Sequence, residues 1–208
     1  MNRQDDRSEC TLVFTIGHSN HPTGRLVALL QTHQVTLLAD VRSVPYSRHQ
    51  PQFNRESLAS TLQQVGVIYV YLGDKLGGRA SPSSNEGSRP PLDYELATNE
   101  LRFRQGIESL IDASRSERVV IMCVEREPLD CHRTLLVARY LASRGVRVCH
   151  IMSDGRLEQH EETENRLLTA TDCLPDLFSP QYGPDDLLRR AYRKRSQTIT
   201  ATTIERSQ

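Results

Sequence analysis

Short apolar runs alternate with longer amphipathic stretches up to about residue 165. The apolar runs are rich in β-branched residues, which is typical of buried strands. The stretches between them repeat leucine and isoleucine at intervals of three and four, the spacing of one helix face. The pattern predicts strands at 11–16, 35–40, 67–72, 118–124 and 146–152, separated by helices, of which the last lies at 131–144.

Strands separated by helices predict an α/β fold with a mainly parallel sheet of about five strands and right-handed crossovers. The stretch 73–93 is rich in Gly, Ser and Pro, so we expect a long loop that closes over a site. We divide the chain into an α/β domain, 11–165, and a C-terminal extension, 171–208. We expect this extension to be partly disordered, with a short basic helix near 187–197, and to be solvated or to bind a partner.

Composition excludes several classes of protein. The 208 residues include 26 basic and 26 acidic side chains, so no global field attracts nucleic acid or a membrane, although a local basic patch remains open. The five cysteines are an odd number, and no apolar leader opens the chain, which predicts reduced thiols in the cytoplasm. No apolar run approaches the roughly 18 residues that span a bilayer. We therefore expect a cytoplasmic protein without a membrane partner.

Polar residues follow each predicted strand at its carboxyl end. Ligands of open α/β sheets bind outside this edge, where the connecting loops meet. At the opposite edge, the turns that lead from helices into strands carry only generic turn residues and charges. The residues expected to converge are His18, Ser19 and Asn20 after the first strand, Asp40 and Arg42 at the second, Gly77, Gly78 and Arg79 after the third, and Cys123, Glu125, Cys131, His132 and Arg133 after the fourth.

The segment "CVEREPLDCHR" (123–133) carries the densest chemistry. We expect Asp130 to cap a helix that begins at Cys131, because the positive end of the helix dipole would then lower the pKa of this thiol. Cys123 ends a buried strand and is either a nucleophile or a small core residue. Glu125 and Asp40 are candidate general acids or bases, or ion-pair partners of nearby arginines.

A metal site at this segment would use Cys123, Cys131 and His132, with His18 or His150 as a further ligand. Seven residues separate the two cysteines, a wider spacing than in familiar structural zinc sites, and adjacent residues at a helix start rarely ligate one ion. We therefore assign no metal ligand and no cofactor from the sequence.

A phosphate site would use the side chains of Arg42, Arg79 and Arg133, and the glycines of "LGGR" would let the backbone approach the ligand. Our leading hypothesis is an enzyme that acts on a phosphate-bearing substrate, a nucleotide or a nucleic acid. One alternative is thiol chemistry of the sulfurtransferase or redox type, and another is a non-enzymatic module that binds nucleic acid or metal. The substrate-binding candidates are His18, Ser19, Asn20, Arg42, Gly77, Gly78, Arg79 and Arg133, and the catalytic candidates are Asp40, Cys123, Glu125, Cys131 and His132.

Six motifs appear in the order "TIGHSN", "DVRS", "PQFN", "LGGR", "CVEREPLDCHR" and "HIMSDG". In this combination the chain resembles the domain-of-unknown-function 488 family over about residues 11–165. The resemblance implies a Rossmann-like three-layer α/β domain, and the usual Ala-Glu of the family is Val124-Glu125 here. A weaker similarity is to rhodaneses and cysteine phosphatases, whose cysteine loop is shorter and neutral. The polar signature of the family falls on Gly17, His18, Ser19, Asp40, Arg42, Gly77, Gly78, Arg79, Cys123, Glu125, Cys131, His132 and Arg133.

Overall fold

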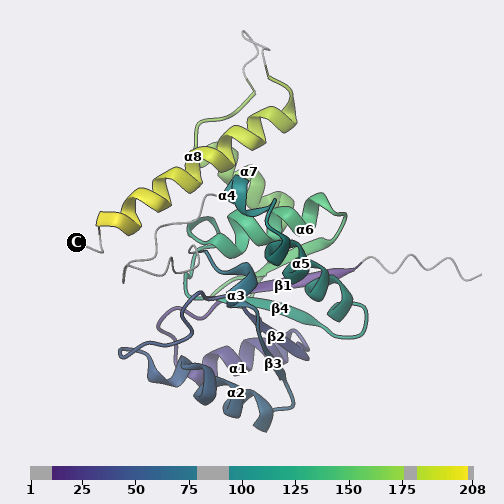
Figure 1. The fold of residues 1–208 in the computed structure, drawn as a ribbon, viewed down its shortest axis with the longest axis vertical. Helices are drawn as coiled ribbons and strands as arrows, with labels where there is room; N and C mark the ends of the chain where they lie inside the picture. The colour runs from purple at the N-terminus through teal and green to yellow at the C-terminus, as the bar shows by residue number, and fades with distance from the viewer. Residues whose placement is uncertain (1–10, 79–93, 176–181, 206–208) are drawn as a thin grey trace, which may run out of the picture.

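A single mixed sheet organises the computed structural model, which describes residues 11–78, 94–175 and 182–205. The strand order is β3-β2-β4-β1-β5-β6, and only the pair β5 and β6 is antiparallel (Figure 1). The five predicted strands are confirmed, whereas β6 was not predicted because it is only three residues long and mostly polar. The strands are β1 (Leu12–Gly17), β2 (Leu37–Asp40), β3 (Ile68–Tyr71), β4 (Val119–Cys123), β5 (Arg147–Ile151) and β6 (Leu157–Gln159).

Helices cover both faces of this sheet and complete the three layers expected of a Rossmann-like α/β domain. Helices α1 (Thr23–Thr32) and α2 (Arg55–Gln64) pack leucines against one face. Helix α5 (Leu101–Ala113) and the segment that follows β4 cover the other face. Figure 1 shows α1 and α2 together below the sheet, with α5 and α6 on the far side. No helix in the described part of the chain combines the length and apolarity needed to cross a membrane.

The segment after β4 begins differently from our prediction. Residues Pro128–Asp130 form a short 3-10 turn (η2), and Cys131 has an extended backbone. The helix begins at Arg133 with six residues of π-helix (η3, Arg133–Ala138) and continues as α6 (Arg139–Ser143). Asp130 is therefore not the cap of this helix, and its carboxylate instead accepts a hydrogen bond from Arg195. Because the backbone of Cys131 is extended and not helical, the adjacent side chains of Cys131 and His132 both face Cys123.

The stretch after β3 is only partly the loop that we predicted. Residues Gly73–Leu76 form a short helix, α3, and Tyr94–Ala97 form another, α4. The residues between Gly78 and α4, which include Arg79 and most of the predicted closing loop, lie outside the described residues.

The C-terminal extension contributes to the core in the part that the structure describes. Helix α8 (Pro184–Glu205) has 22 residues, more than the short helix predicted, and packs against α7 (His160–Ala170). Its Leu187, Ala191 and Tyr192 are buried. This apolar stripe recurs at helical spacing within "LLRRAYRKR", where the arginines dominated the sequence interpretation. The prediction that this segment is solvated was therefore wrong for α8.

The strand order places the carboxyl ends of β2, β4 and β1 side by side. The chain runs from β1 to β2 and β3 over one face, and then returns through β4, which lies between β2 and β1. The segments after β1 and β4 consequently leave the sheet toward opposite faces, and this is the position in the strand order beside which α/β proteins bind ligands. The register pairs Gly17 with Cys123 and Asp40 with Met122, so three strand ends are level at this edge.

Candidate functional site

Two cysteines and a histidine meet at the carboxyl end of β4. The Sγ atoms of Cys123 and Cys131 and a ring nitrogen of His132 all lie within 4.8 Å of one another. The Nδ1 atom of His132 is 3.6 Å from the sulfur of Cys123 and 3.9 Å from that of Cys131. Both cysteines are free thiols and buried. We call these three residues the Cys2His cluster.

The imidazole of His132 is oriented by the neighbouring strand. Its Nε2 atom lies 3.1 Å from the carbonyl oxygen of Val41, just beyond β2. A carbonyl oxygen only accepts hydrogen bonds, so Nε2 carries the ring hydrogen and donates it. The other ring nitrogen, Nδ1, faces the two sulfurs. A histidine that binds a metal through one ring nitrogen commonly donates the N–H of the other to a backbone carbonyl, which fixes the orientation of the ring.

The two thiols of the cluster differ in acidity. Burial alone would raise the pKa of Cys131, but a hydrogen bond from the Cys123 thiol and the positive charge of Arg133 lower that pKa well below its ordinary value. The hydrogen bond to Cys131, together with burial, raises the pKa of Cys123. Of the two thiols, that of Cys131 is therefore the more acidic.

Arg133 supports the loop that surrounds the cluster. Its side chain is 1% exposed, and its Nη1 and Nη2 atoms donate to the carbonyl oxygens of Glu125 (2.5 Å) and Arg126 (3.3 Å). Its Nε atom is buried without a hydrogen-bond partner among the described residues. The guanidinium thus stabilises the loop after β4 and places a positive charge beside the thiols.

Asp40 and Arg42 form a buried ion pair next to the cluster. The Arg42 side chain donates from Nε to Oδ1 of Asp40 (2.9 Å) and from Nη2 to Oδ2 (2.6 Å), and also to the carbonyl oxygen of Phe53. The hydroxyl of Tyr69 donates to the same carboxylate. Both oxygens of Asp40 are therefore occupied inside the protein. The pair holds the backbone around Val41, whose carbonyl orients His132.

His18 completes this buried group. Its ring stacks on Phe53 with centroids 4.1 Å apart, and its Nε2 accepts a hydrogen bond from Nη1 of Arg42 at 3.3 Å. Burial, with the charge of Arg42, lowers the pKa of His18 to about 4. His18 is consequently neutral at physiological pH and connects β1 to the ion pair.

Two glycines of the "LGGR" motif let the chain approach the cluster. A Cβ at Gly78 would lie 2.7 Å from the ring of His132, and a Cβ at Gly77 would lie 2.5 Å from Oγ of Ser43. The sequence interpretation assigned these glycines to a ligand. In the structure the close neighbour of Gly78 is the imidazole itself.

Gly17 allows a tighter approach still, and this gives a first prediction. A Cβ on Gly17 would lie 1.8 Å from the carbonyl oxygen of Glu125, which Arg133 also holds. We expect Gly17→Ala to lower the free energy of unfolding by about 1–3 kcal/mol, since the loop after β4 must move. Urea unfolding of Gly17→Ala and of Gly24→Ala measures this. Gly24 lies in α1 with nothing near its Cβ position, so its substitution should be neutral or stabilising, and equal effects at both sites would contradict the prediction.

The other predicted site residues lie at the rim. Glu125 is exposed, and loss of hydration together with the charge of Cys131 raises the pKa of its carboxyl. Ser19 is half-buried, with a left-handed backbone, and its backbone N–H donates to the carbonyl of Val124. Asn20 is exposed and is hydrogen-bonded only by Ser19 among the described residues.

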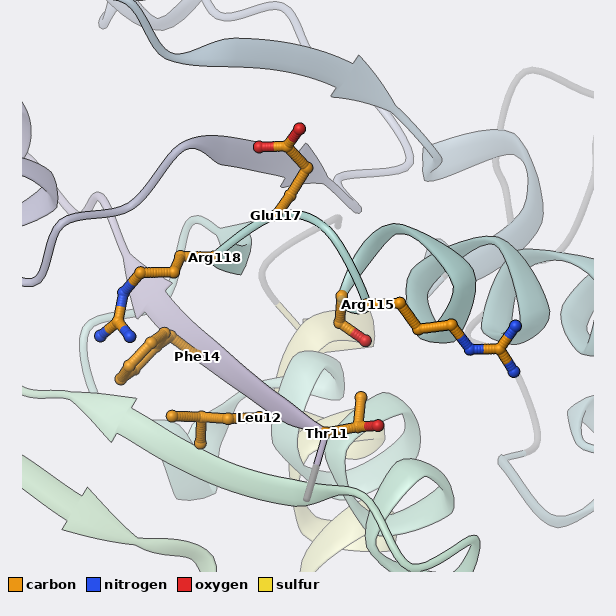
Figure 2. Close-up of a pocket in the computed structure, with 7 residues that line it drawn as sticks. Thr11, Leu12, Phe14, Arg115, Glu117 and Arg118 are labelled. Carbon is orange, nitrogen blue, oxygen red and sulfur yellow. The ribbon is translucent and has the colours of Figure 1, made fainter. Parts of the chain in front are cut away.

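The opposite edge of the sheet also carries a pocket, at the amino ends of β1 and β4 (Figure 2). Its charged groups have partners within the protein. Arg118 lies over the ring of Phe14 and donates to the carbonyl of His33, and Glu117 accepts from Thr36. The described residues that line it include no cysteine or histidine. The cysteine and histidine side chains of the cluster therefore lie at the carboxyl edge and not at this pocket.

A second buried polar group includes His150, which the sequence offered as a further metal ligand but which is not part of the Cys2His cluster. His150 on β5 contacts Thr15 (2.7 Å) and His160 (3.0 Å), and His160 in turn lies 3.1 Å from the hydroxyl of Tyr192 on α8. Both histidines are at most 2% exposed. A polar residue within the apolar strand "VRVCHIM" was the available signal, because a buried polar group needs a partner.

Comparison with known proteins identifies one relationship. The family model described as "Domain of unknown function DUF488" matches residues 22–141, which is more than half of the chain and contains the whole Cys2His cluster. No curated protein and no solved structure matches the chain.

Proposed function

The chain belongs to the DUF488 family, and from the geometry of its Cys2His cluster we propose that it is a zinc-dependent enzyme with the metal at the carboxyl end of β4. The observation that carries the proposal is the spacing of the three donor atoms. Zinc–sulfur and zinc–nitrogen bonds of about 2.3 and 2.0–2.1 Å put S and N ligands about 3.6 Å apart in a tetrahedron. The two S–N distances in the cluster are 3.6 and 3.9 Å.

The chemistry of the donors also suits zinc. The pKa of Cys131 is lowered by its surroundings, and zinc would displace the proton of Cys123, as it does from coordinating thiols. His132 presents the lone pair of Nδ1, with its other nitrogen bonded to Val41. Three protein ligands leave the fourth position of a tetrahedron for water or substrate, which is typical of catalytic zinc sites.

Residues around the cluster would have different roles. We infer that Glu125, on the exposed loop, accepts or donates protons, because Asp40 is fully bonded to Arg42 and Tyr69. Of the three arginines expected to hold phosphate, Arg42 and Arg133 are hydrogen-bonded within the protein, and Arg79 lies outside the described residues. A phosphate-bearing substrate therefore stays a prediction, which depends at this edge on Arg79 and on exposed backbone.

Metal analysis of the full chain tests the proposal. We expect about one zinc ion per chain after purification without chelator, and intense near-ultraviolet thiolate-to-cobalt absorption after replacement by Co²⁺. Cys123→Ser, Cys131→Ser and His132→Gln should each lose the metal. Cys149→Ser is the matched control, because Cys149 is also a buried free thiol but lies on β5, bonded to Gln159. Zinc retained in Cys131→Ser, or no zinc bound by the wild type, would rule the proposal out.

Thiol chemistry is the second candidate, and the low pKa of Cys131 beside Cys123 favours it. A thiolate next to a thiol can carry sulfur as a persulfide or form a disulfide with its neighbour. Mass spectrometry of the same samples, purified without chelator, separates the two functions. A persulfide or disulfide confined to these two cysteines, without zinc in the freshly purified protein, would support this candidate over the metal site.

A further inference from the structure

A second pocket lies between α4, the segment η3–α6 and α8, and nothing in the proposed zinc chemistry uses it. Its volume is about 370 Å³, within the range of small-ligand sites. Three arginines face one acidic residue across its lining, together with tyrosine rings and leucines. The residues of this lining on which the argument depends are Tyr94, Glu95, Arg139, Tyr140, Arg189 and Arg193.

Arg139 is the cation without a counter-charge in direct contact. Its guanidinium lies 4.5 Å from the ring centroid of Tyr192, and it forms no hydrogen bond or ion pair with another residue that the structure describes. The other two cations are paired at the surface, Arg193 with Glu95 and Arg189 with Asp186 at 3.5 Å. Burial lowers the pKa of Arg139, and the charges of Glu95 and Glu164 offset this effect only in part. An anion in the pocket would supply the counter-charge in direct contact.

Aromatic and apolar surface lies beside these charges. Tyr94 is half-buried, and its hydroxyl has no hydrogen-bond partner among the described residues. The ring of Tyr140 is held edge-on against Phe103 at 5.2 Å, and Leu135 and Leu136 complete the wall. Arginine forks bind phosphate oxygens, and tyrosine rings stack on flat heterocycles.

We propose that this pocket binds a nucleoside phosphate, with Arg139 and Arg189 on the phosphate groups and Tyr94 and Tyr140 against the base. Arg189 and Arg193 in the lining belong to the basic helix that the sequence predicted, so only one side of α8 faces the pocket. Arg190 on the same helix points elsewhere, since its guanidinium lies over Tyr182. The site is separate from the Cys2His cluster. Burial raises the pKa of Tyr94, and the nearby Cys131 raises it further.

Calorimetric titration of the full-length protein with ADP tests the assignment. We expect one saturable site that is weakened about tenfold or more in Arg139→Gln and several-fold in Arg189→Gln, since each loses a charge-assisted hydrogen bond. Arg190→Gln is the matched control and should bind ADP as the wild type does. Arg189 is 60% exposed, so its variant keeps the test valid if Arg139→Gln fails to fold.

Further titrants separate the ligand classes. Pyrophosphate and adenosine should each bind more weakly than ADP, because each reaches only half of the pocket. The proposal is overturned if ADP shows no saturable binding, if Arg189→Gln and Arg190→Gln bind it equally, or if pyrophosphate binds as tightly as ADP. It is also overturned if a single-stranded oligonucleotide binds and ADP does not. Zinc content measured in the same samples keeps this result separate from the metal proposal.

Discussion

Replacing Arg42 by methionine is expected to lower the free energy of unfolding by about 3–5 kcal/mol, because the variant leaves the Asp40 carboxylate buried without its cation. Arg42 and Asp40 are 4% and 0% exposed, so water cannot substitute for the lost hydrogen bonds. The same change removes the donor to the carbonyl of Phe53 and the contact with His18. Urea unfolding at neutral pH, with the same denaturant dependence in both proteins, measures the difference.

An exposed ion pair provides the control for this prediction. Arg115 and Asp112 lie 3.1 Å apart but are 70% and 67% exposed, so Arg115→Met should change the free energy of unfolding by less than about 1 kcal/mol. A loss below about 1 kcal/mol in Arg42→Met as well would show that the buried pair does not stabilise the fold. If the pair orients His132 through Val41, Arg42→Met should also bind zinc more weakly than the wild type.

Acid is expected to destabilise the protein through its buried histidines, most clearly through His160. Burial lowers the pKa of His160 to about 4 from an ordinary value near 6.5. Between these two values the unfolded chain binds a proton that the folded protein does not, so stability falls as the pH falls. The contribution is fully present above pH 6.5 and is lost by about pH 4, and it amounts to about 3 kcal/mol.

The surroundings of His160 explain why it stays neutral when folded. His150 faces it from β5 and is itself kept neutral by burial, which lowers its pKa, and Tyr192 faces it from α8. Glu164 on the same helix lies 3.5 Å away, and the charge of Glu161 opposes the effect of burial on the pKa of His160 without cancelling it. Protonation would therefore place a buried charge between β5 and α8 and weaken their contact.

Unfolding titrations between pH 7.5 and 4 test this prediction. The loss of stability over this range should be about 3 kcal/mol smaller in His160→Gln than in the wild type, because the glutamine does not titrate. His49→Gln is the control, since His49 is exposed and its removal should leave the pH profile unchanged. Parallel profiles for the wild type and His160→Gln would contradict the assignment.

Sequence patterning predicted the candidate site better as a location than as an arrangement. Parallel strands end at one edge, so Cys123, Asp40 and His18 had to lie near one another once five strands were recognised. The structure brings these residues together, although Asp40 forms an ion pair with Arg42 and not with a ligand. Charge patterns along a chain do not distinguish an arginine that binds a ligand from one that binds a carboxylate two residues away.

The metal interpretation shows the same limit. Adjacent Cys131 and His132 were expected at a helix start, where their side chains diverge by about 100°. The structure extends the backbone at Cys131 and begins the helix two residues later, so both side chains face Cys123. The close approach of Gly78 to His132 and the acceptor at Val41 come from other segments of the chain, and no local spacing predicts them.

The sequence by itself determined the alternation of strands and helices, the parallel sheet, the edge where the polar residues of the motifs gather and the family of the chain, because periodicity and glycine positions are local properties of a chain. Only the tertiary structure decided the strand order, the pairing of Asp40 with Arg42, the meeting of two cysteines with one histidine nitrogen, and the packing of α8. These depend on hydrogen bonds and side-chain contacts between residues far apart in the chain, and such contacts form only when the layers pack together.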